Sequence, residues 1–308
     1  MRRVENMQRS YCLIVRIVLR VCMLFSVHAG IFLTCSWAQQ PILQQLVYLN
    51  IPAYNLNLYT QYADQRWERL SVPVGVGRAA DRKYQTPTGQ GELYVKATGV
   101  TFEYGSQNPK ELVGKTITHS NTFDKNTLKP ITMKMPNDMK SIFMRINSDI
   151  DAQFHTRFVL HETTDWYTVG TPASNGCIRI DREDMHRLYA ALAPSVYEGP
   201  LPQSVPITIY YDVAEYYPEQ KMMVLHANIY NRQVDYVYEI LHDLQEAGID
   251  TRLMNMPALV EIVNQAEQQF HQALHTIQSR LKKAPFDRLI KDHEKQLLHF
   301  TFYLRFQY

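Results

Sequence analysis

The sequence predicts a mainly β protein that also contains helices, with the helices concentrated in its last third. Short runs of β-branched and aromatic residues, bounded by Pro and Gly turns, recur between residues 42 and 212. After about residue 213, apolar residues recur at steps of three or four, the spacing of amphipathic helices. The 308 residues are 45% hydrophobic and 20% charged, as in an ordinary globular protein.

The first 38 residues have the pattern of a secretory signal peptide. Five arginines precede an uncharged run, "VCMLFSVHAGIFLT" (21–34), and small residues at Ser36 and Ala38 mark a cleavage point. The run is shorter than the roughly 20 residues that a spanning helix needs. An uncleaved anchor and a lipobox ending at Cys35 are the alternatives. We therefore expect a mature chain that starts near Gln39, outside the cytoplasm and without a membrane span.

The charge of the chain gives little reason to expect a nucleic-acid partner. The formal net charge is +2, and five arginines lie in the predicted signal peptide, so the remainder is close to neutral. A near-neutral body offers no electrostatic basis for binding nucleic acid or an anionic membrane surface.

Several segments in the first two thirds of the chain are expected to form strands. Within 42–75, "LVYLNI" and "NLNLYTQ" flank the breaker "PAY", and "WERLSVPVGVG" continues the pattern into a charged loop. "TPTGQGEL" (86–93) has turn chemistry, and 98–141 is expected to be a long excursion with short strands. Further strands are expected at "SIFMRIN" (141–147), "TRFVLH" (156–161), "CIRI" (177–180) and "VPITIYYD" (205–212).

Helices are expected after the "CIRI" strand and in the C-terminal third. Asp181 is suited to cap a helix over "DREDMHRLYAAL". Segments 234–247 and 257–283 are predicted to be helical, and the second has one apolar stripe made of Leu259, Val263, Ala266, Phe270, Leu274, Ile277 and Leu281. The terminal "LHFTFYLRFQY" alternates strictly between apolar and other residues, which predicts a strand.

Cys177 is the only cysteine after the predicted signal peptide, so it cannot form an internal disulfide in the mature chain. One interpretation is a small buried apolar residue. The other interpretation is a nucleophile, and the residues on either side of Cys177 favour this second interpretation. Gly176 permits unusual backbone angles, and the amides from Asn175 to Cys177 could form an oxyanion hole. Arg179, two residues along the strand, should face the same side as the thiol.

His161 is the candidate general base, since a thiol needs a partner to accept its proton. It ends a predicted strand sixteen residues before Cys177. Spacing alone does not establish that the two residues meet. The segment "HETTD" is not a zinc-protease motif because its fifth residue is Asp165, and no G-x-S-x-G elbow is present. One cysteine without paired histidines also excludes the usual Cys-based zinc sites, so no metal is expected.

The segment "HETTDWYTVGTPASNGCIR" (161–179) resembles the signature of the L,D-transpeptidases of the YkuD family, a histidine followed about sixteen residues later by a Ser-His-Gly-Cys block. "LVYLNIPAYNLNLYT", the "VGVG" and "TPTG" turns and "VPITIYYD" resemble other parts of that family, in order, over residues 42–212. The resemblance implies a YkuD-like β-sandwich or mixed-sheet catalytic domain with a short helix after the cysteine strand. With the signal peptide expected at 1–38, the resemblance assigns 39–212 to the catalytic domain and leaves 213–308 as a mostly helical extension.

The resemblance also implies a reaction, without a cofactor. Cys177 would attack the bond between the third residue of a peptidoglycan stem peptide, diaminopimelate, and D-alanine, with His161 as the general base. The acyl group of the resulting thioester would be transferred to an amine of a second stem peptide or of a lipoprotein lysine. Such an enzyme would work in the periplasm and would be a carbapenem target. Gly176, Ser174, Asn175 and Arg179 would line the oxyanion hole or bind substrate.

The sequence departs from the family pattern in two places. Asn175 stands where the family usually has a second histidine, and Asn cannot titrate. Glu162 follows the base histidine, and its carboxylate would favour the imidazolium form if it approached the ring. An L,D-carboxypeptidase, a sortase-like anchoring enzyme and a non-catalytic peptidoglycan-binding protein on the same scaffold are the alternatives.

Overall fold

The structure is a computed structural model that describes residues 41–94, 116–123, 130–134, 141–148, 158–163, 165–197, 204–282 and 289–304. The predicted signal peptide and much of the 98–141 excursion lie outside these ranges. The contacts divide the chain into two units, Met1–Leu43 with Gln61–Arg66, and Gln44–Thr60 with Trp67–Tyr308. All the residues of the candidate site belong to the second unit.

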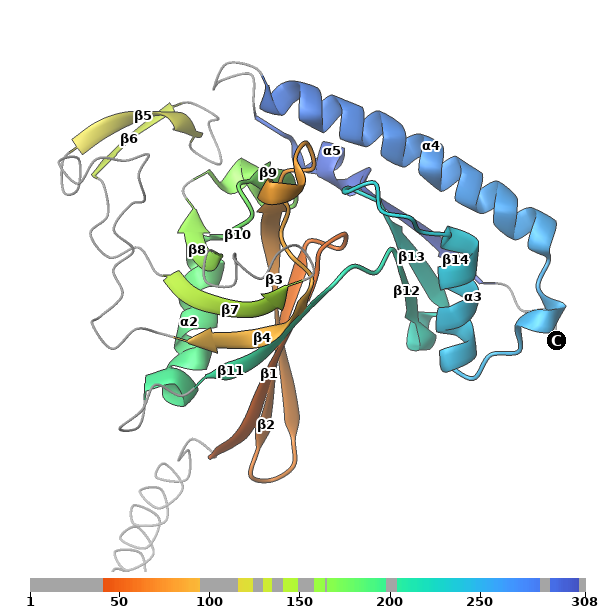
Figure 1. Cartoon of the computed structure of the whole chain (residues 1–308), viewed down its shortest axis with the longest axis horizontal. Coiled ribbons are helices and arrows are strands. Elements are labelled where there is room, and N and C mark those ends of the chain that lie inside the picture. Colours follow the sequence, from red (N-terminus) through yellow and green to blue (C-terminus); the bar gives the residue numbers. More distant parts are fainter. Residues whose placement is uncertain are drawn as a thin grey trace, which may run out of the picture. The chain divides into compact units, whose positions relative to one another are not determined.

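A mixed sheet of nine strands forms the first part of the fold (Figure 1). Its strands are β1 (Ile42–Asn50), β2 (Asn55–Tyr62), β3 (Trp67–Gly77), β4 (Gly89–Tyr94), β7 (Ser141–Ser148), β8 (Val159–Thr163), β9 (Pro172–Ser174), β10 (Ile178–Asp181) and β11 (Val205–Tyr210). They follow the order β10-β8-β7-β4-β11-β1-β2-β3-β9, and β10 also pairs with β3. The sheet therefore curls until its two sides meet, which confirms the mixed-sheet fold expected from the sequence.

The alternation of buried and less buried residues along the strands identifies the face of the sheet that forms the core. On β1 and β11, the residues Val47, Leu49, Ile207 and Ile209 are buried, while the residues between them are not. Alternate side chains point to opposite faces of a strand, so these apolar residues cover a single face and form the core inside the curl. A separate two-stranded sheet joins β5 (Thr116–Phe123) and β6 (Pro130–Lys134), within the excursion that the sequence predicted to hold short strands.

Helix α2 (Arg182–Tyr197) follows β10 directly, as predicted. The Asp181 carboxylate accepts a hydrogen bond from the Glu183 N–H at 3.2 Å, which satisfies one of the first amides of the helix. Its buried residues Met185, Leu188 and Leu192 belong to the same core as the sheet. The helix packs against β3, β8 and β10, and so supports the strand that follows Cys177 and the two strands that pair with it.

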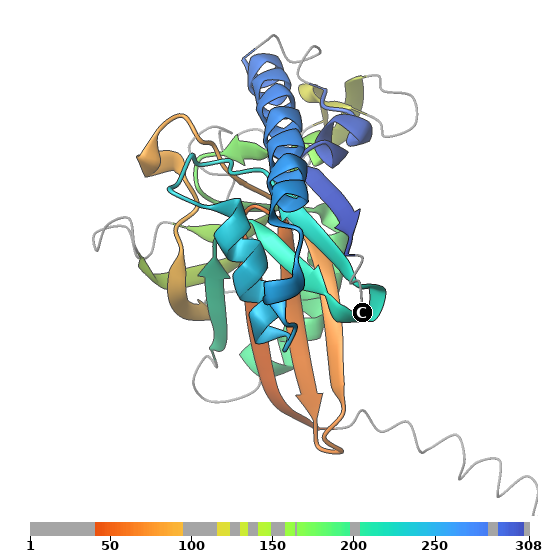
Figure 2. The same cartoon turned by 90° about the vertical axis from the view of Figure 1, so that its right-hand side faces the viewer.

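The C-terminal part combines helices with a small sheet (Figure 2). Strands β12 (Ala214–Tyr217), β13 (Met222–His226) and β14 (His299–Tyr303) form an antiparallel sheet. Helices α3 (Tyr236–Glu246), α4 (Met256–Leu281) and α5 (Asp292–Gln296) accompany it, with α3 against β12 and α4 against α3, α5 and β14. The two long helices and the last strand were predicted; β12 and β13 were not.

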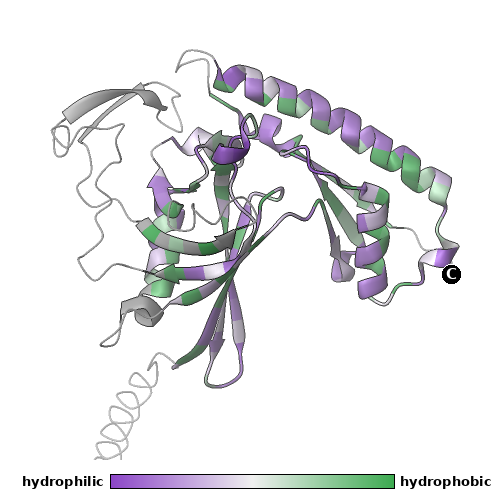
Figure 3. Ribbon diagram, viewed as in Figure 1, coloured by the Kyte–Doolittle hydropathy of each residue, from purple (hydrophilic) through white to green (hydrophobic). Residues whose placement is uncertain are grey.

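Helix α4 carries the apolar stripe that its sequence predicts (Figure 3). Of the seven predicted residues, Leu274 and Leu281 are half-buried and the rest are buried: Leu259, Val263, Ala266, Phe270 and Ile277. At its start, the Asn255 side chain accepts a hydrogen bond from the Ala258 N–H at 3.2 Å. Within the described ranges, no helix is both long enough and apolar enough to cross a membrane.

Candidate active site

Strands β8 and β10 place His161 beside Arg179, and Cys177 directly precedes β10. The strands are parallel, with His161 opposite Arg179 and Leu160 opposite Ile178. Leu160 and Ile178 point into the core and are fully buried, whereas His161, Cys177 and Arg179 are half-buried. Standard strand spacings put the Cα atoms of His161 and Cys177 roughly 8 Å apart, as diagonal neighbours. The thiol of Cys177 takes part in no disulfide in the described part of the chain.

One hydrogen bond sets the tautomer of His161. Its Nδ1 lies 2.8 Å from the backbone carbonyl oxygen of Glu162. A carbonyl can only accept, so Nδ1 carries the proton and Nε2 presents its lone pair. Burial, reinforced by the positive charge of Arg179, lowers the pKa of His161 to about 4, against the opposing effect of the Glu162 carbonyl. The ring is therefore neutral at physiological pH, the form that can accept a proton.

Glu162 points away from this ring. Its side chain is fully buried on the opposite face of β8, with its carboxylate 3.4 Å from Arg182 Nε and 3.5 Å from His186 Nε2 on α2. Adjacent residues on a strand face opposite sides, which explains the separation. Of the two outcomes that the sequence left open for Glu162, the structure has the one in which its carboxylate does not approach the base.

The turn before Cys177 is held by Ser174 and requires glycine at position 176. Ser174 Oγ accepts from the Gly176 N–H at 3.0 Å and donates to the Cys177 carbonyl at 2.5 Å. Gly176 has φ +106°, and a Cβ atom there would lie 2.4 Å from Phe158 Cε1. Both the backbone angle and the lack of space exclude a side chain. Ser174 is 2% exposed, so its hydroxyl serves the turn.

A second network ties this turn to distant parts of the chain. Thr86 Oγ1 donates to the Gly176 carbonyl and accepts from the Gly77 N–H, both at 2.9 Å. Tyr230 OH accepts from the Thr86 N–H at 3.0 Å and donates to the Gly77 carbonyl at 2.9 Å. The "VGVG" and "TPTG" turns are therefore joined by hydrogen bonds to each other and to the turn that precedes Cys177. Sequence reasoning recognised Thr86 only as a turn residue, and no pattern pointed to Tyr230.

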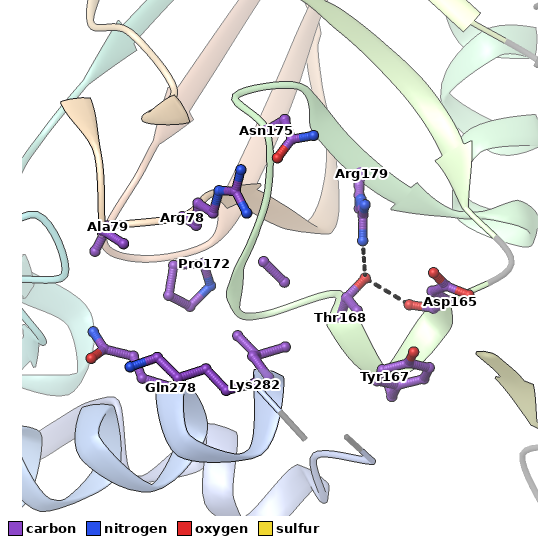
Figure 4. Close-up of a pocket in the computed structure, with 13 residues that line it drawn as sticks. Arg78, Ala79, Asp165, Tyr167, Thr168, Pro172, Asn175, Arg179, Gln278 and Lys282 are labelled. Atoms are coloured by element: carbon purple, nitrogen blue, oxygen red, sulfur yellow. Dashed lines mark hydrogen bonds between the residues drawn. The ribbon is translucent and has the colours of Figure 1, made fainter. Parts of the chain in front are cut away.

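A cleft of about 640 Å³ lies beside the cysteine turn (Figure 4). Asn175 and Arg179, which flank Cys177, both line it, and Asn175 is exposed. Other walls come from the loop after β3, from the segment around Thr168 and from the end of α4; they are Arg78, Ala79, Ala80, Asp165, Tyr167, Thr168, Pro172, Ala173, Gln278, Leu281 and Lys282. The structure thus brings the C-terminal part to the cleft.

The charged residues that line the cleft are mainly cations. They are Arg78, Arg179 and Lys282, with one acid, Asp165. Arg179 Nη1 lies 3.4 Å from Thr168 Oγ1, and the Arg78 guanidinium lies over the ring of Tyr84 at 3.9 Å. Such a lining favours ligands that carry carboxylates.

The chain belongs to the family defined by the YkuD L,D-transpeptidase catalytic domain, whose model matches residues 44–207. No curated protein matches the chain in sequence. Among solved structures, Bd1075 of Bdellovibrio bacteriovorus is similar at 12% identity and a TM-score of 0.29, over 55% of this chain and 47% of that chain. The helical cell shape determining protein Pgp2 of Campylobacter jejuni is similar at 14% identity and a TM-score of 0.27, over 56% and 50%. The chain spans about half the length of each.

Proposed function

We propose that the protein is a cysteine L,D-transpeptidase that acts on the stem peptides of peptidoglycan. Family membership supports the reaction class. The observation that carries the assignment of roles is the β8–β10 register, in which His161 lies opposite Arg179 on the face expected for Cys177. A neutral imidazole that carries its proton on Nδ1 matches the role of a base.

In the proposed reaction, Cys177 Sγ attacks the carbonyl carbon of the third stem residue, diaminopimelate. The thiol proton passes to His161 Nε2, and the carbonyl oxygen gains the electron pair of its π bond. When the intermediate collapses, the C–N bond breaks and the proton passes to the D-alanine amine, leaving a thioester. An acceptor amine then forms the new amide bond and returns the proton to sulfur.

Backbone amides at the cysteine turn would stabilise the oxyanion. The Gly176 N–H already donates to Ser174, so we assign this role to the amides of Asn175 and Cys177. Gly176 and Ser174 then act by shaping the turn. Arg179, with Arg78 and Lys282 further along the cleft, would bind carboxylates of the stem peptide.

The acceptor is a separate question, and an L,D-carboxypeptidase is the second candidate. Asn175 supplies no titrating group where the family usually has a histidine. The end of α4 lines one side of the cleft, which favours a small acceptor such as water. A second stem peptide or a lipoprotein lysine would need an open approach to the thioester.

Purified tetrapeptide muropeptides distinguish these functions. Cross-linked dimers would establish transpeptidation, and tripeptides alone would establish carboxypeptidation. Absence of both products, with Cys177 still readily alkylated, would favour a non-catalytic peptidoglycan-binding protein. A carbapenem adduct on Cys177, seen by intact-mass spectrometry, would add support for an acylating cysteine.

We also propose that residues 1–38 are a signal peptide, 39–212 the catalytic domain and 213–308 an extension, and that the enzyme works in the periplasm. A peptidoglycan substrate lies outside the cytoplasm, which agrees with this placement. N-terminal sequencing of the protein from a cell-envelope fraction should give Gln39 as the first residue. A start at Met1 would instead support an uncleaved anchor.

A further inference from the structure

The outward face of the sheet carries aromatic residues where polar ones are expected. On a sheet with one buried face, the outward positions are normally polar. Here Tyr48 on β1 and Tyr59 on β2 occupy outward positions between buried residues, and Tyr210 follows the buried Ile209 at the end of β11. Trp67, at the start of β3, is 46% exposed. These four residues, from four neighbouring strands, are called the aromatic platform below.

The aromatic platform lines a shallow hollow of about 520 Å³. Leu46, Asn57 and Thr208 complete its lining. The rings of Tyr48 and Tyr59 meet edge to face with centroids 5.8 Å apart, and Tyr48 lies opposite Thr208 in the register of β1 and β11. The hollow shares no lining residue with the cleft beside Cys177, so both can be occupied at once.

A second, polar hollow of about 350 Å³ continues from the first and shares Asn57, Tyr59 and Tyr210 with it. Ser71 hydrogen-bonds to the amide groups of Asn55 and Asn57, which fixes both amides at this surface. The second hollow holds one cation, Arg69, and four acidic side chains, from Asp212, Glu215, Asp243 and Glu246.

These features decide between classes of ligand. Aromatic faces bind ligands that present flat apolar surfaces, while amide, hydroxyl and carboxylate groups bind hydroxyls. The excess of carboxylates repels nucleic acids and other polyanions. A dry protein interface would place its polar groups at the rim, whereas here they lie inside the hollows. A sugar ring meets all these requirements, because it has apolar C–H faces and many hydroxyls.

We propose that the aromatic platform binds the glycan strand of the cell-wall polymer and so holds the enzyme on it while the cleft takes a stem peptide. The identity of the polymer rests on the proposed function; the preference for an uncharged oligosaccharide rests on the platform alone. Trp67 and Tyr59 supply the stacking surface, and Asn57 with Thr208 supplies hydrogen bonds to sugar hydroxyls and acetamido groups.

Calorimetric titration of the full chain, as its Cys177→Ala variant, with the hexamer of β-1,4-linked N-acetylglucosamine tests this proposal. We expect saturable binding that weakens roughly tenfold on Trp67→Ala or Tyr59→Ala, since each removes a stacking ring. Tyr238→Ala is the matched control, because Tyr238 is a 61% exposed aromatic residue on α3 that lines neither hollow. Circular dichroism checks that each variant is folded, and Tyr59→Phe should retain most of the binding.

Three results would overturn the proposal. The first is no saturable binding of the hexamer, and the second is equal binding by Trp67→Ala, Tyr59→Ala and Tyr238→Ala. The third is a change of oligomeric state on Trp67→Ala without hexamer binding, which would make the platform a contact between copies of the chain. Turnover of a glycan-free tetrapeptide by the Cys177 enzyme tests the proposed function separately, and Trp67→Ala should leave that turnover unchanged.

Discussion

At the scale of single residues, burial, one hydrogen bond and one charge suit His161 to the base role that we propose for it. The Glu162 carbonyl fixes the proton on Nδ1, while burial and Arg179 keep the ring neutral down to about pH 4. The pair that we propose at rest is therefore a thiol beside a neutral imidazole. Proton transfer then accompanies attack on the carbonyl, and Arg179 lies close enough to influence that transfer.

Replacement of Arg179 should shift the pH dependence of catalysis. Only the neutral ring accepts a proton, so the rate falls as the pH drops through the pKa of His161. Arg179→Gln removes the positive charge that lowers this pKa, while burial remains. We expect the acid limb of kcat/KM to move up by about one pH unit. Arg179→Lys should restore the original limb; an unmoved limb in Arg179→Gln would mean that another group controls it.

Thr86 should matter both for stability and for activity. Thr86→Val keeps the shape of the side chain but removes its hydrogen bonds to Gly176 and Gly77. Leaving these buried groups without a partner should lower the free energy of unfolding by about 1–3 kcal/mol. Urea unfolding measures the loss, and muropeptide turnover should fall with it. Thr301→Val, the same change on an exposed stretch of β14, should alter neither; equal effects would contradict the role of Thr86.

The sequence predicted the candidate residues of the site better than their connections. Cys177 and His161 followed from their order along the chain and from the family resemblance. The direction of Glu162 and the bond from Gly176 to Ser174 depend on which face each residue occupies, which requires the strand register. Tyr230 was not predictable, because its contacts join residues more than a hundred positions apart.

At the scale of elements, strands and helices with a clear hydrophobic period were predicted, and short ones were not. Strands β7, β8, β10 and β11 and helices α2, α3 and α4 lie close to their predicted places. Strands β12 and β13 have four and five residues, too short for an alternation to stand out. They are stabilised as strands by pairing with each other and with β14, from far along the chain.

The side chain of Asp243, on helix α3, should make the stability of the protein depend on pH. Burial, reinforced by the negative charge of Asp212, raises the pKa of Asp243 from 3.8 to about 7. The folded protein therefore holds a proton that the unfolded chain releases, so this group's contribution to stability falls between about pH 4 and pH 7. Asp243→Asn removes that fall, and its advantage over the wild type should grow across this window.

Urea unfolding at pH 4.5 and pH 7.5 measures this difference. Glu261→Gln is the control, since it neutralises an exposed acid on α4 and should have little effect at either pH. If Asp243→Asn changed stability equally at both values, the raised pKa of Asp243 would be wrong.

At the scale of the whole molecule, the C-terminal part contributes directly to the candidate site. Lys282 and Gln278 line the cleft from the end of α4, and Tyr230 supports the cysteine turn. Buried residues from both parts of the chain form one core cluster. The sequence predicted the helices of this part, yet it could not predict that α4 ends at the cleft, because this contact is not local.

Lys282 should affect substrate binding more than chemistry. Lys282→Ala removes an exposed cation from the cleft. Because an exposed charge contributes modestly to the free energy of substrate binding, KM should rise about two- to fivefold with kcat unchanged. The effect should shrink in high salt, because salt screens the charge. Arg252→Ala, a cation before the opposite end of α4, should leave KM unchanged. A fall in kcat alone would contradict a binding role.

The most direct measurement of the proposed activity is mass spectrometry of the protein mixed rapidly with a tetrapeptide stem and quenched in acid. We predict a tripeptide acyl group bound as a thioester to Cys177, with one D-alanine released per adduct and no adduct in Cys177→Ala. Release of D-alanine by Cys177→Ala, or an acyl group on another residue, would contradict the account.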